Sequence, residues 1–433
     1  MPGAAEPVVD VPGAADARAA APASAACGPV RADAGEDAPA AGWRTQRAIG
    51  YGESERQHAR DSRSLRLKVV TSIVVLVVLG YASLGVMGAA GGTDYIYCTA
   101  YQLYTPAEVA RVLYLHVYNF LGGTLHLWSA HPTSWLIENA PGYWAVPGRA
   151  GVIGITLLCA CLLSVAGMLY QNVFKNPIAT PGMLGASSGV SLGMVLLVYL
   201  YGTAASGMTT LRYALCYACG AAVLVIVVAG GRLMSGRGRA LDVVGMMLVG
   251  AAVSRALRMA VQFVTEYLMD EETYELYYSL SEMLSVDTSG IAWLCLAVAC
   301  VVSFTPVLVV RFKLNALAFD EQEVRQFGID LTRLRLLALV CGAIMMLAAQ
   351  IHAGMITLVS LVVPFLARSW FGCEARQQLA GCLCIGPILL LVCRDIVDLI
   401  PFVGEGLAIG TAVSVLALPL FIVIMGRHMR GWD

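Results

Sequence analysis

The feature that most constrains this chain is a series of long apolar segments that recur along residues 69–426. A membrane-spanning helix needs about 20 consecutive apolar residues to cross the hydrocarbon core. Most of the segments reach that length, and they occupy residues 69–90, 150–170, 184–202, 211–230, 241–264, 289–311, 334–350, 355–368, 378–399 and 406–426. Lipid accepts an apolar exterior, which fits a chain that is 58% hydrophobic and only 13% charged. The sequence therefore predicts an all-α integral membrane protein with about ten transmembrane helices.

The distribution of basic residues predicts how these helices are oriented. With the N-terminus inside, nearly every Lys and Arg near a helix end falls on the cytoplasmic side, from Lys175 and Arg232 to Arg368 and Arg427. The outer loops receive only three arginines, namely Arg111, Arg149 and Arg212. This asymmetry is the positive-inside pattern, and it places both termini in the cytoplasm.

Two regions lie outside this repeating pattern. Residues 1–65 begin as an Ala/Pro/Gly-rich stretch and become basic, so we expect a disordered cytoplasmic tail before a permease domain at 66–433. The first outer loop, 91–149, is long and contains Thr105, Pro106 and Glu108 ahead of an apolar run. These residues form the pattern of a capping box, which predicts an amphipathic helix on the outer side.

The segment NPIATPGMLGASSGVSLG at residues 176–193 interrupts the membrane pattern with prolines and glycines. Broken backbone at membrane depth is tolerated only where protein or a water-filled cavity covers it. The segment is therefore predicted to line a polar path across the bilayer or its cytoplasmic mouth, although an ordinary turn between helices is the alternative. The residues assigned to this path are Asn176, Pro177, Pro181, Gly185, Ser187, Ser188 and Gly189.

Two charged residues fall inside the apolar segment 241–264. Arg255 and Arg258 are three residues apart, so they share one helix face, and we expect them toward its outer end. Ionisable residues within the membrane are costly and by default indicate function, so they are candidates for the same path. The alternatives are that their side chains snorkel to the outer surface, or that they pair with the acidic stretch 270–275.

Several motifs together resemble those of one family. Residues 176–189 are similar to the NPLADPxxLGxSSG motif of the type II ABC importer permeases, which carry iron-siderophores, haem or cobalamin. Three further segments match that family in order: VVGMMLVGAAVSRAL at 243–257, ALAFDEQEVRQFGID at 316–330 and AGMITLVSLVVPFLAR at 353–368. The chain departs from the family pattern at Thr180 and Phe365, where members often have Asp and His.

The resemblance implies how such a chain works. Its cytoplasmic loop 312–333 would dock into a separate ATPase through Asp320, Glu321, Glu323, Arg325 and Gly328. Arg111, Arg149 and Arg212 would meet acidic residues of an extracytoplasmic binding protein. The chain contains no GxxxxGK[ST] phosphate loop, so ATP would be handled by two partner ATPase subunits. A second permease copy, or a sister subunit, would complete the pore.

The resemblance therefore predicts a multi-pass permease of a prokaryotic cell membrane, with no catalytic residue and no cofactor of its own. No metal site is expected, because the spacings of the histidines match no ligand motif. A net charge of −1 argues against nucleic acid as a partner. The alternative is a secondary transporter driven by an ion gradient, a class that often has inverted repeats and acidic residues near the bilayer midplane. Ferric siderophore, haem and cobalamin all remain open as cargo.

Overall fold

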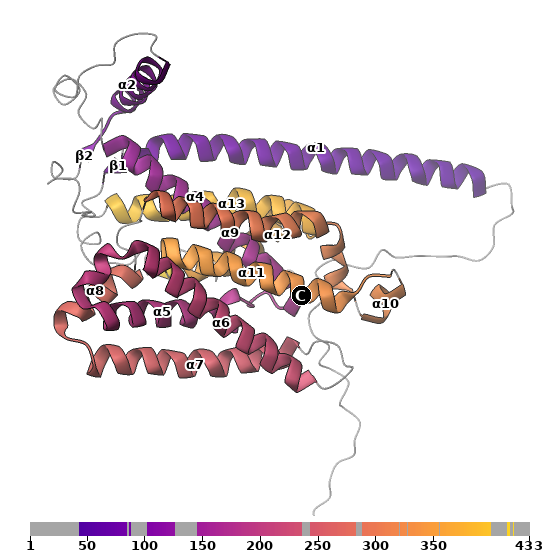
Figure 1. Cartoon of the computed structure of the whole chain (residues 1–433). Helices are drawn as coiled ribbons and strands as arrows, with labels where there is room; N and C mark the ends of the chain where they lie inside the picture. Colours follow the sequence, from indigo (N-terminus) through magenta and orange to yellow (C-terminus); the bar gives the residue numbers. More distant parts are fainter. Residues whose placement is uncertain are drawn as a thin grey trace, which may run out of the picture. The chain divides into compact units, whose positions relative to one another are not determined.

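The computed structural model describes an almost entirely helical chain (Figure 1). The described residues are 43–84, 86–87, 102–125, 145–235, 243–282, 288–319, 321–326, 328–354, 356–399, 414–415 and 419. The α-helices are α1 Trp43–Leu84, α2 Pro106–Leu125, α4 Ala145–Phe174, α5 Ala186–Tyr201, α6 Thr209–Ser235, α7 Val243–Tyr267, α8 Glu271–Glu282, α9 Gly290–Val310, α10 Glu321–Gln326, α11 Leu331–Ala353, α12 Thr357–Phe371 and α13 Ala375–Leu399. Short 3-10 helices occupy η1 Pro181–Leu184, η2 Gly202–Gly207 and η3 Lys313–Ala318, and a two-residue antiparallel pair joins β1 Val86–Met87 to β2 Gln102–Leu103.

Helices α4 and α11 form the centre of the bundle. Helix α4 packs against α11, α12 and α13, while α11 also contacts α9. The apolar side chains of α4, α9, α11, α12 and α13 together make up most of the main buried cluster, which includes Leu162, Tyr170 and Met346. Close approach of α4 to α12 depends on Gly167, where an added Cβ would lie 1.8 Å from the backbone oxygen of Ser360. Small residues at such crossings let membrane helices pack by van der Waals contact.

A second group of helices, α5, α6 and α7, packs together beside this core (Figure 1). Gly189 and Gly193 stand four residues apart on α5 and face α6. An added Cβ at Gly189 would lie 2.7 Å from the Cα of Gly220, and one at Gly193 would lie 2.8 Å from the Cα of Cys216. The two backbones therefore touch along a small-xxx-small stripe, a common contact between membrane helices.

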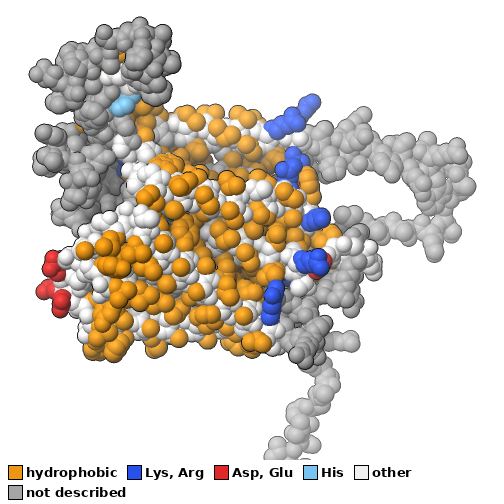
Figure 2. Space-filling view, in the orientation of Figure 1, with side chains coloured by type: hydrophobic (Ala, Val, Ile, Leu, Met, Phe, Trp, Pro, Cys, Tyr) orange, Lys and Arg blue, Asp and Glu red, His pale blue; other side chains and the backbone are white. Residues whose placement is uncertain are grey.

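The membrane architecture expected from the sequence is confirmed. Among the described residues, 8 helices are long and apolar enough to cross a bilayer, and α12 adds a shorter apolar helix at Leu358–Phe371. The tenth predicted segment, 406–426, lies almost wholly outside the described residues. Lys and Arg side chains gather at one end of the bundle, and a cluster of Asp and Glu side chains lies at the other (Figure 2). This separation agrees with the predicted orientation and marks the α10 end as cytoplasmic.

Helix α1 differs from the prediction because it begins at Trp43, within the segment expected to be a disordered tail. Residues 53–68 are rich in Glu, Gln and Arg, which are strong helix formers, so the spanning helix extends in the N-terminal direction. Residues 1–42 lie outside the described residues.

Helix α2 begins as predicted, with a capping box. The Glu108 carboxylate accepts hydrogen bonds from the Thr105 backbone N–H at 2.7 Å and from the Thr105 hydroxyl at 2.8 Å. The Glu108 backbone N–H lies 3.4 Å from the Thr105 hydroxyl oxygen and completes the pair of contacts. The hydrogen bond from the Thr105 backbone N–H is the main reason that the pKa of Glu108 lies below its ordinary value, and the bond from the Thr105 hydroxyl lowers it further.

Candidate functional site

Among the described residues, helix α7 carries exposed charged side chains near the middle of a candidate membrane span, Gly245–Tyr267. This helix packs chiefly against α5, α6 and η1, which leaves its opposite face uncovered by those elements. Arg255 and Arg258 are both exposed, beside apolar residues such as Met259. Neither arginine has a hydrogen bond or ion pair to any other described residue, so the alternative of a pairing with the acidic stretch 270–275 is not observed in the described structure. Because α7 spans 243–267, both arginines sit near its middle rather than toward its outer end.

The broken segment at 176–193 lies behind this surface. It begins with an Asx turn, in which the Ile178 backbone N–H donates to the Asn176 side-chain oxygen at 3.0 Å. The one-turn helix η1 then ends at Gly185, whose φ of +79° is the left-handed conformation that glycine adopts without strain. A Cβ at Gly185 would lie 2.8 Å from the Ser254 hydroxyl oxygen of α7, and the Ser188 hydroxyl donates to the Ser254 backbone oxygen at 3.4 Å.

The path residues predicted in this segment therefore differ in burial. Pro181, Gly185, Ser188 and Gly189 are buried, and the last three are packed between α5, α6 and α7. Ser187 is half-buried and its backbone oxygen accepts from the Gln350 side chain at 3.3 Å, while Pro177 is half-buried and Asn176 is exposed at the cytoplasmic end. In this conformation the segment supports the rear face of α7, whereas Arg255 and Arg258 occupy the open face.

The predicted coupling loop, 312–333, contains η3 and the short helix α10, which form a platform at the basic end of the bundle. Leu314, Leu317 and Val324 are buried and attach this loop to the bundle. The Asn315 side-chain oxygen accepts the Ala375 backbone N–H at 2.7 Å at the start of α13, and Lys175 donates to the Phe319 backbone oxygen at 3.1 Å. The platform is thus linked to α4 and α13 as well as to its own neighbours in sequence.

The structure describes some of the predicted coupling residues in full and others only in part. Glu323 is exposed on α10, and Gly328 is exposed with a φ of +69° just before α11. Glu321 and Arg325 lie on α10, but their side chains are outside the described residues, as is the whole of Asp320. The exposed Glu323 lies on the same loop as Phe319, which is also exposed.

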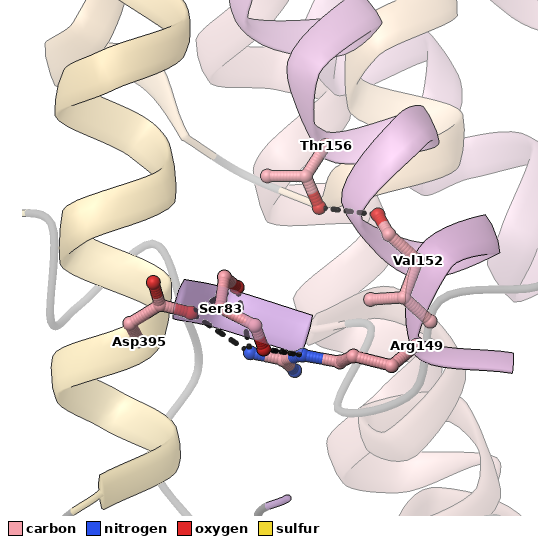
Figure 3. Close-up of polar contacts among 5 residues, drawn as sticks. All are labelled: Ser83, Arg149, Val152, Thr156 and Asp395. Carbon is pink, nitrogen blue, oxygen red and sulfur yellow. Dashed lines mark hydrogen bonds and ion pairs between the residues drawn. The ribbon is translucent and has the colours of Figure 1, made fainter. Parts of the chain in front are cut away.

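Of the three predicted docking arginines, Arg149 is buried and contacts residues of the same chain (Figure 3). Its guanidinium pairs with the Asp395 carboxylate at 2.9 Å and donates through Nε to the Ser83 backbone oxygen at 3.3 Å. The Ser83 hydroxyl also donates to Asp395 at 2.6 Å. Only 8% of the Arg149 side chain and 16% of the Asp395 side chain are exposed. The cluster joins the outer ends of α1, α4 and α13.

The other two docking arginines lie in contrasting surroundings. Arg212 is buried at the start of α6, where its guanidinium carbon lies 5.0 Å from the centroid of the Tyr213 ring. The Tyr213 ring in turn lies 4.8 Å from that of the buried His352 on α11. Arg111 is exposed on α2. Among the described residues, Arg111 alone of the three presents an accessible side chain to an outer partner.

Sequence reasoning missed the polar cluster at the cytoplasmic end of the core. The Gln171 side chain on α4 donates to the Leu361 backbone oxygen at 3.0 Å and accepts from Arg368, while the neighbouring Asn172 donates to Gln378 at 3.1 Å. The signal was available, because polar side chains inside apolar helices need partners at membrane depth. The cluster ties α4 to α12 and α13.

Comparison with known proteins decides the class of this chain. Residues 143–427 match the FecCD transport family, which is more than half of the chain. The chain belongs to the FecCD transport family. It is 31% identical, over 63% of its length and 80% of the relative's, to the Fe(3+) dicitrate transport system permease protein FecC of Escherichia coli K12. It is 28% identical, over 75% of its length and 92% of the relative's, to the vitamin B12 import system permease protein BtuC of Yersinia enterocolitica.

A solved structure supports the same fold. The chain matches an inward-facing conformation of a metal-chelate type ABC transporter with a TM-score of 0.61. The two sequences are 18% identical, and the match covers 84% of this chain and 99% of the other. The family assignment and the permease relatives make the chain a multi-pass permease of a bacterial ABC importer, not itself the ATPase. These findings favour the predicted importer over the ion-gradient alternative.

Proposed function

We propose that this FecCD-family permease moves an iron chelate or cobalamin into the cytoplasm by alternating access. Its relatives include permeases of Fe(3+) dicitrate and vitamin B12 systems, which supports this range of cargo. The working importer would contain two permease copies, two cytoplasmic ATPases and an extracytoplasmic binding protein. We also propose that residues 1–65 form a cytoplasmic extension of the permease domain at 66–433, and that loops 91–149 and 312–333 lie on opposite sides of the membrane.

The observation that carries the path assignment is the exposure of Arg255 and Arg258 on the open face of α7. A charge facing hydrocarbon at the centre of a helix costs about 2.5–3.5 kcal/mol on insertion scales and more in simulations. An α1 surface built from Val70, Val74 and Val77 faces lipid without that penalty. We therefore propose that α7 faces a second permease copy across a water-filled path, with the 176–193 segment holding it from behind.

The coupling proposal rests on the platform of η3 and α10. It exposes Glu323 and Phe319, while buried Leu314, Leu317 and Val324 fix it to the bundle. Contacts to α4 and α13 would let a push on this platform move whole helices, which is the rigid-body switching expected of such machines.

The coupling proposal is tested by reversing one charge. We expect Glu323→Arg to lower co-purification with the partner ATPase and to lower ATP-dependent uptake in the same proportion. Glu272→Arg is the matched control, because Glu272 is also exposed but lies on α8 at the opposite end of the bundle. Unchanged association and uptake for Glu323→Arg would refute the assignment of α10 as the ATPase contact.

Docking of the binding protein is proposed to use Arg111 in preference to Arg149 and Arg212, which are buried. Arg111→Glu should weaken binding of the partner binding protein to the permease in proteoliposomes while leaving thermal stability unchanged. Arg149→Gln should instead lower thermal stability even without any partner. If Arg111→Glu binds the partner as the wild type does, the docking surface lies elsewhere.

A further inference from the structure

Helix α7 carries a continuous polar stripe along its open face. Arg255, Arg258, Gln262 and Glu266 follow one another at spacings of three and four residues, and all four are exposed. Such spacings place side chains above one another on a single side of a helix. The Gln262 side chain donates to the Glu266 carboxylate at 2.8 Å, so Glu266 already has a partner nearer than the arginines.

The arginines lie at the depth where a charge is most costly. At 1.5 Å per residue, Arg255 is about 15 Å from Gly245 at the cytoplasmic start of the span, and Arg258 is about 13 Å from Tyr267 at its outer end. Half of a typical hydrocarbon core is also about 15 Å thick. An arginine side chain extends roughly half of that distance, so snorkelling to either surface does not free the guanidiniums from the membrane interior.

The charges on this stripe are separated along the helix. Glu266 is eight residues from Arg258, about 12 Å along the axis, which is too far for a direct ion pair. The middle of the face is therefore positive and its outer end is negative. In an assembly with a second copy of the same face, the guanidiniums of both copies would repel one another in a dry contact. They are compatible only with water or with an anion between them.

We infer that Arg255 and Arg258 make the path selective for an anionic, carboxylate-bearing metal chelate. The inference rests on the proposed function, since it assigns a cargo class to the proposed path. Each guanidinium presents a planar fork of N–H donors that matches a carboxylate, and charge-assisted bonds of this kind are about twice as strong as neutral ones. A neutral cargo could accept hydrogen bonds from these donors but would bring no carboxylate, so both guanidinium charges would stay uncompensated.

The face is tested first without cargo or partners, by chemical modification of the full-length permease in membranes. Met259 lies four residues after Arg255 on the same face and is 67% exposed. Met259→Cys should react faster with an anionic methanethiosulfonate than with a cationic one of similar size. Since a unit charge about 7 Å away in water changes each rate severalfold, each arginine should contribute about five- to tenfold to the rate ratio. Arg255→Gln and Arg258→Gln should each lower the ratio by that factor.

Two controls make this measurement decisive. Val74→Cys on the apolar face of α1 should react with neither charged reagent, because a thiol in hydrocarbon is not ionised and charged reagents do not enter it. Cys373 is an exposed native thiol, so it is replaced by Ser in every variant to remove its background. Failure of Met259→Cys to react with either charged reagent would mean that the face contacts lipid. A rate ratio near one would mean that the face is wet but not positive, and either result overturns the inference.

Cargo selection is tested by uptake into proteoliposomes that contain the permease, its ATPase and its binding protein. The probes are radioactive ferric citrate, a neutral ferric trihydroxamate and cobalamin. We expect ATP-dependent uptake of ferric citrate, lowered at least about tenfold in the double variant Arg255→Gln/Arg258→Gln because two charge-assisted contacts are lost.

The outcomes separate this inference from the proposed function. Uptake of only the neutral chelate or cobalamin would leave the importer function standing and overturn the selectivity for anions. Equal uptake of ferric citrate by the wild type and the double variant would do the same. A wild type that takes up none of the three probes would count against the proposed cargo range, and the modification ratio at Met259→Cys would then decide the charge of the path.

Discussion

Breaking the ion pair between Arg149 and Asp395 should destabilise the permease before any partner is present. The pair closes at 2.9 Å with both side chains mostly buried, and the Ser83 hydroxyl adds a second bond to the same carboxylate at 2.6 Å. The perturbations are Asp395→Asn, Arg149→Met and the two substitutions combined. Each single change leaves one charged group without its counter-ion near the outer ends of three helices.

The magnitude follows from this burial. Removing one partner of a buried ion pair costs about 3–5 kcal/mol, because the remaining charge stays desolvated and uncompensated. Asp395 is 16% exposed, so water reaches part of the site and the lower end of that range applies. We expect about 3 kcal/mol for Asp395→Asn, which strands the guanidinium. We expect about 2–3 kcal/mol for Arg149→Met, where the Ser83 hydroxyl still bonds the carboxylate.

The double variant separates the pair from its surroundings. Replacing both partners leaves no stranded charge, so its cost should fall well below the sum of the two single costs. The expected coupling energy is at least about 1.5 kcal/mol, within the range for groups in direct contact. The assay is thermal and denaturant unfolding of the three variants and the wild type in the same detergent, without ATPase or binding protein.

Two results would refute the reasoning. Additive single costs would mean that the two side chains do not interact in the folded protein. Unchanged stability of Arg149→Met, together with lost binding of the outer partner, would return Arg149 to the docking surface that the sequence first suggested.

Three further predictions concern helix contacts and a cap. Gly189→Leu should sharply lower the yield of folded protein on size-exclusion chromatography, because a Cβ there would lie 2.7 Å from the Cα of Gly220. Gly207→Ala is the control and should leave the yield unchanged, because no atom lies within 4 Å of the added Cβ. Gly167→Val should be equally disruptive by the same measurement, since its Cβ would lie 1.8 Å from the Ser360 backbone oxygen. The Glu108 pKa is depressed below its ordinary 4.5, so its capping contribution is complete above that pH and is lost as the pH falls through the lowered pKa. Hydrogen exchange in the first turn of α2, corrected for intrinsic rates, should therefore accelerate in acid for the wild type but not for Glu108→Gln.

Most of the membrane architecture was predictable because apolar length is a strong signal in lipid. The segments expected at 241–264 and 289–311 became α7 at Val243–Tyr267 and α9 at Gly290–Val310. Helix α8 at Glu271–Glu282 was missed, since its mixture of acidic and aromatic residues has no spanning pattern. The early start of α1 was also missed, because the Ala/Pro/Gly-rich and basic composition of residues 1–65 favours disorder although residues 53–68 contain strong helix formers.

The roles of the polar residues were harder to predict, because they depend on neighbours distant in sequence. Arg149 and Arg212 lie beside outer loops, so their positions in the sequence favoured an outer partner. Burial of Arg149 depends on Ser83 and Asp395, which are 66 and 246 residues away. Gly189 lies in a motif suggestive of a path, yet its contact with Gly220 is a helix crossing that only the three-dimensional arrangement reveals.

Three groups of arginines in the described structure differ in what surrounds them. The first group lies at the cytoplasmic end and includes Arg333 on α11, whose side chain is 90% exposed. Such exposed basic residues orient the chain. Arg149 and Arg212 are buried among side chains and contribute to packing. Arg255 and Arg258 fit neither description, because they are exposed at membrane depth without a partner in the described part of the chain. Neutralising a member of each group should therefore change a different observable: topology for the first, stability for the second and discrimination among cargo charges for the third.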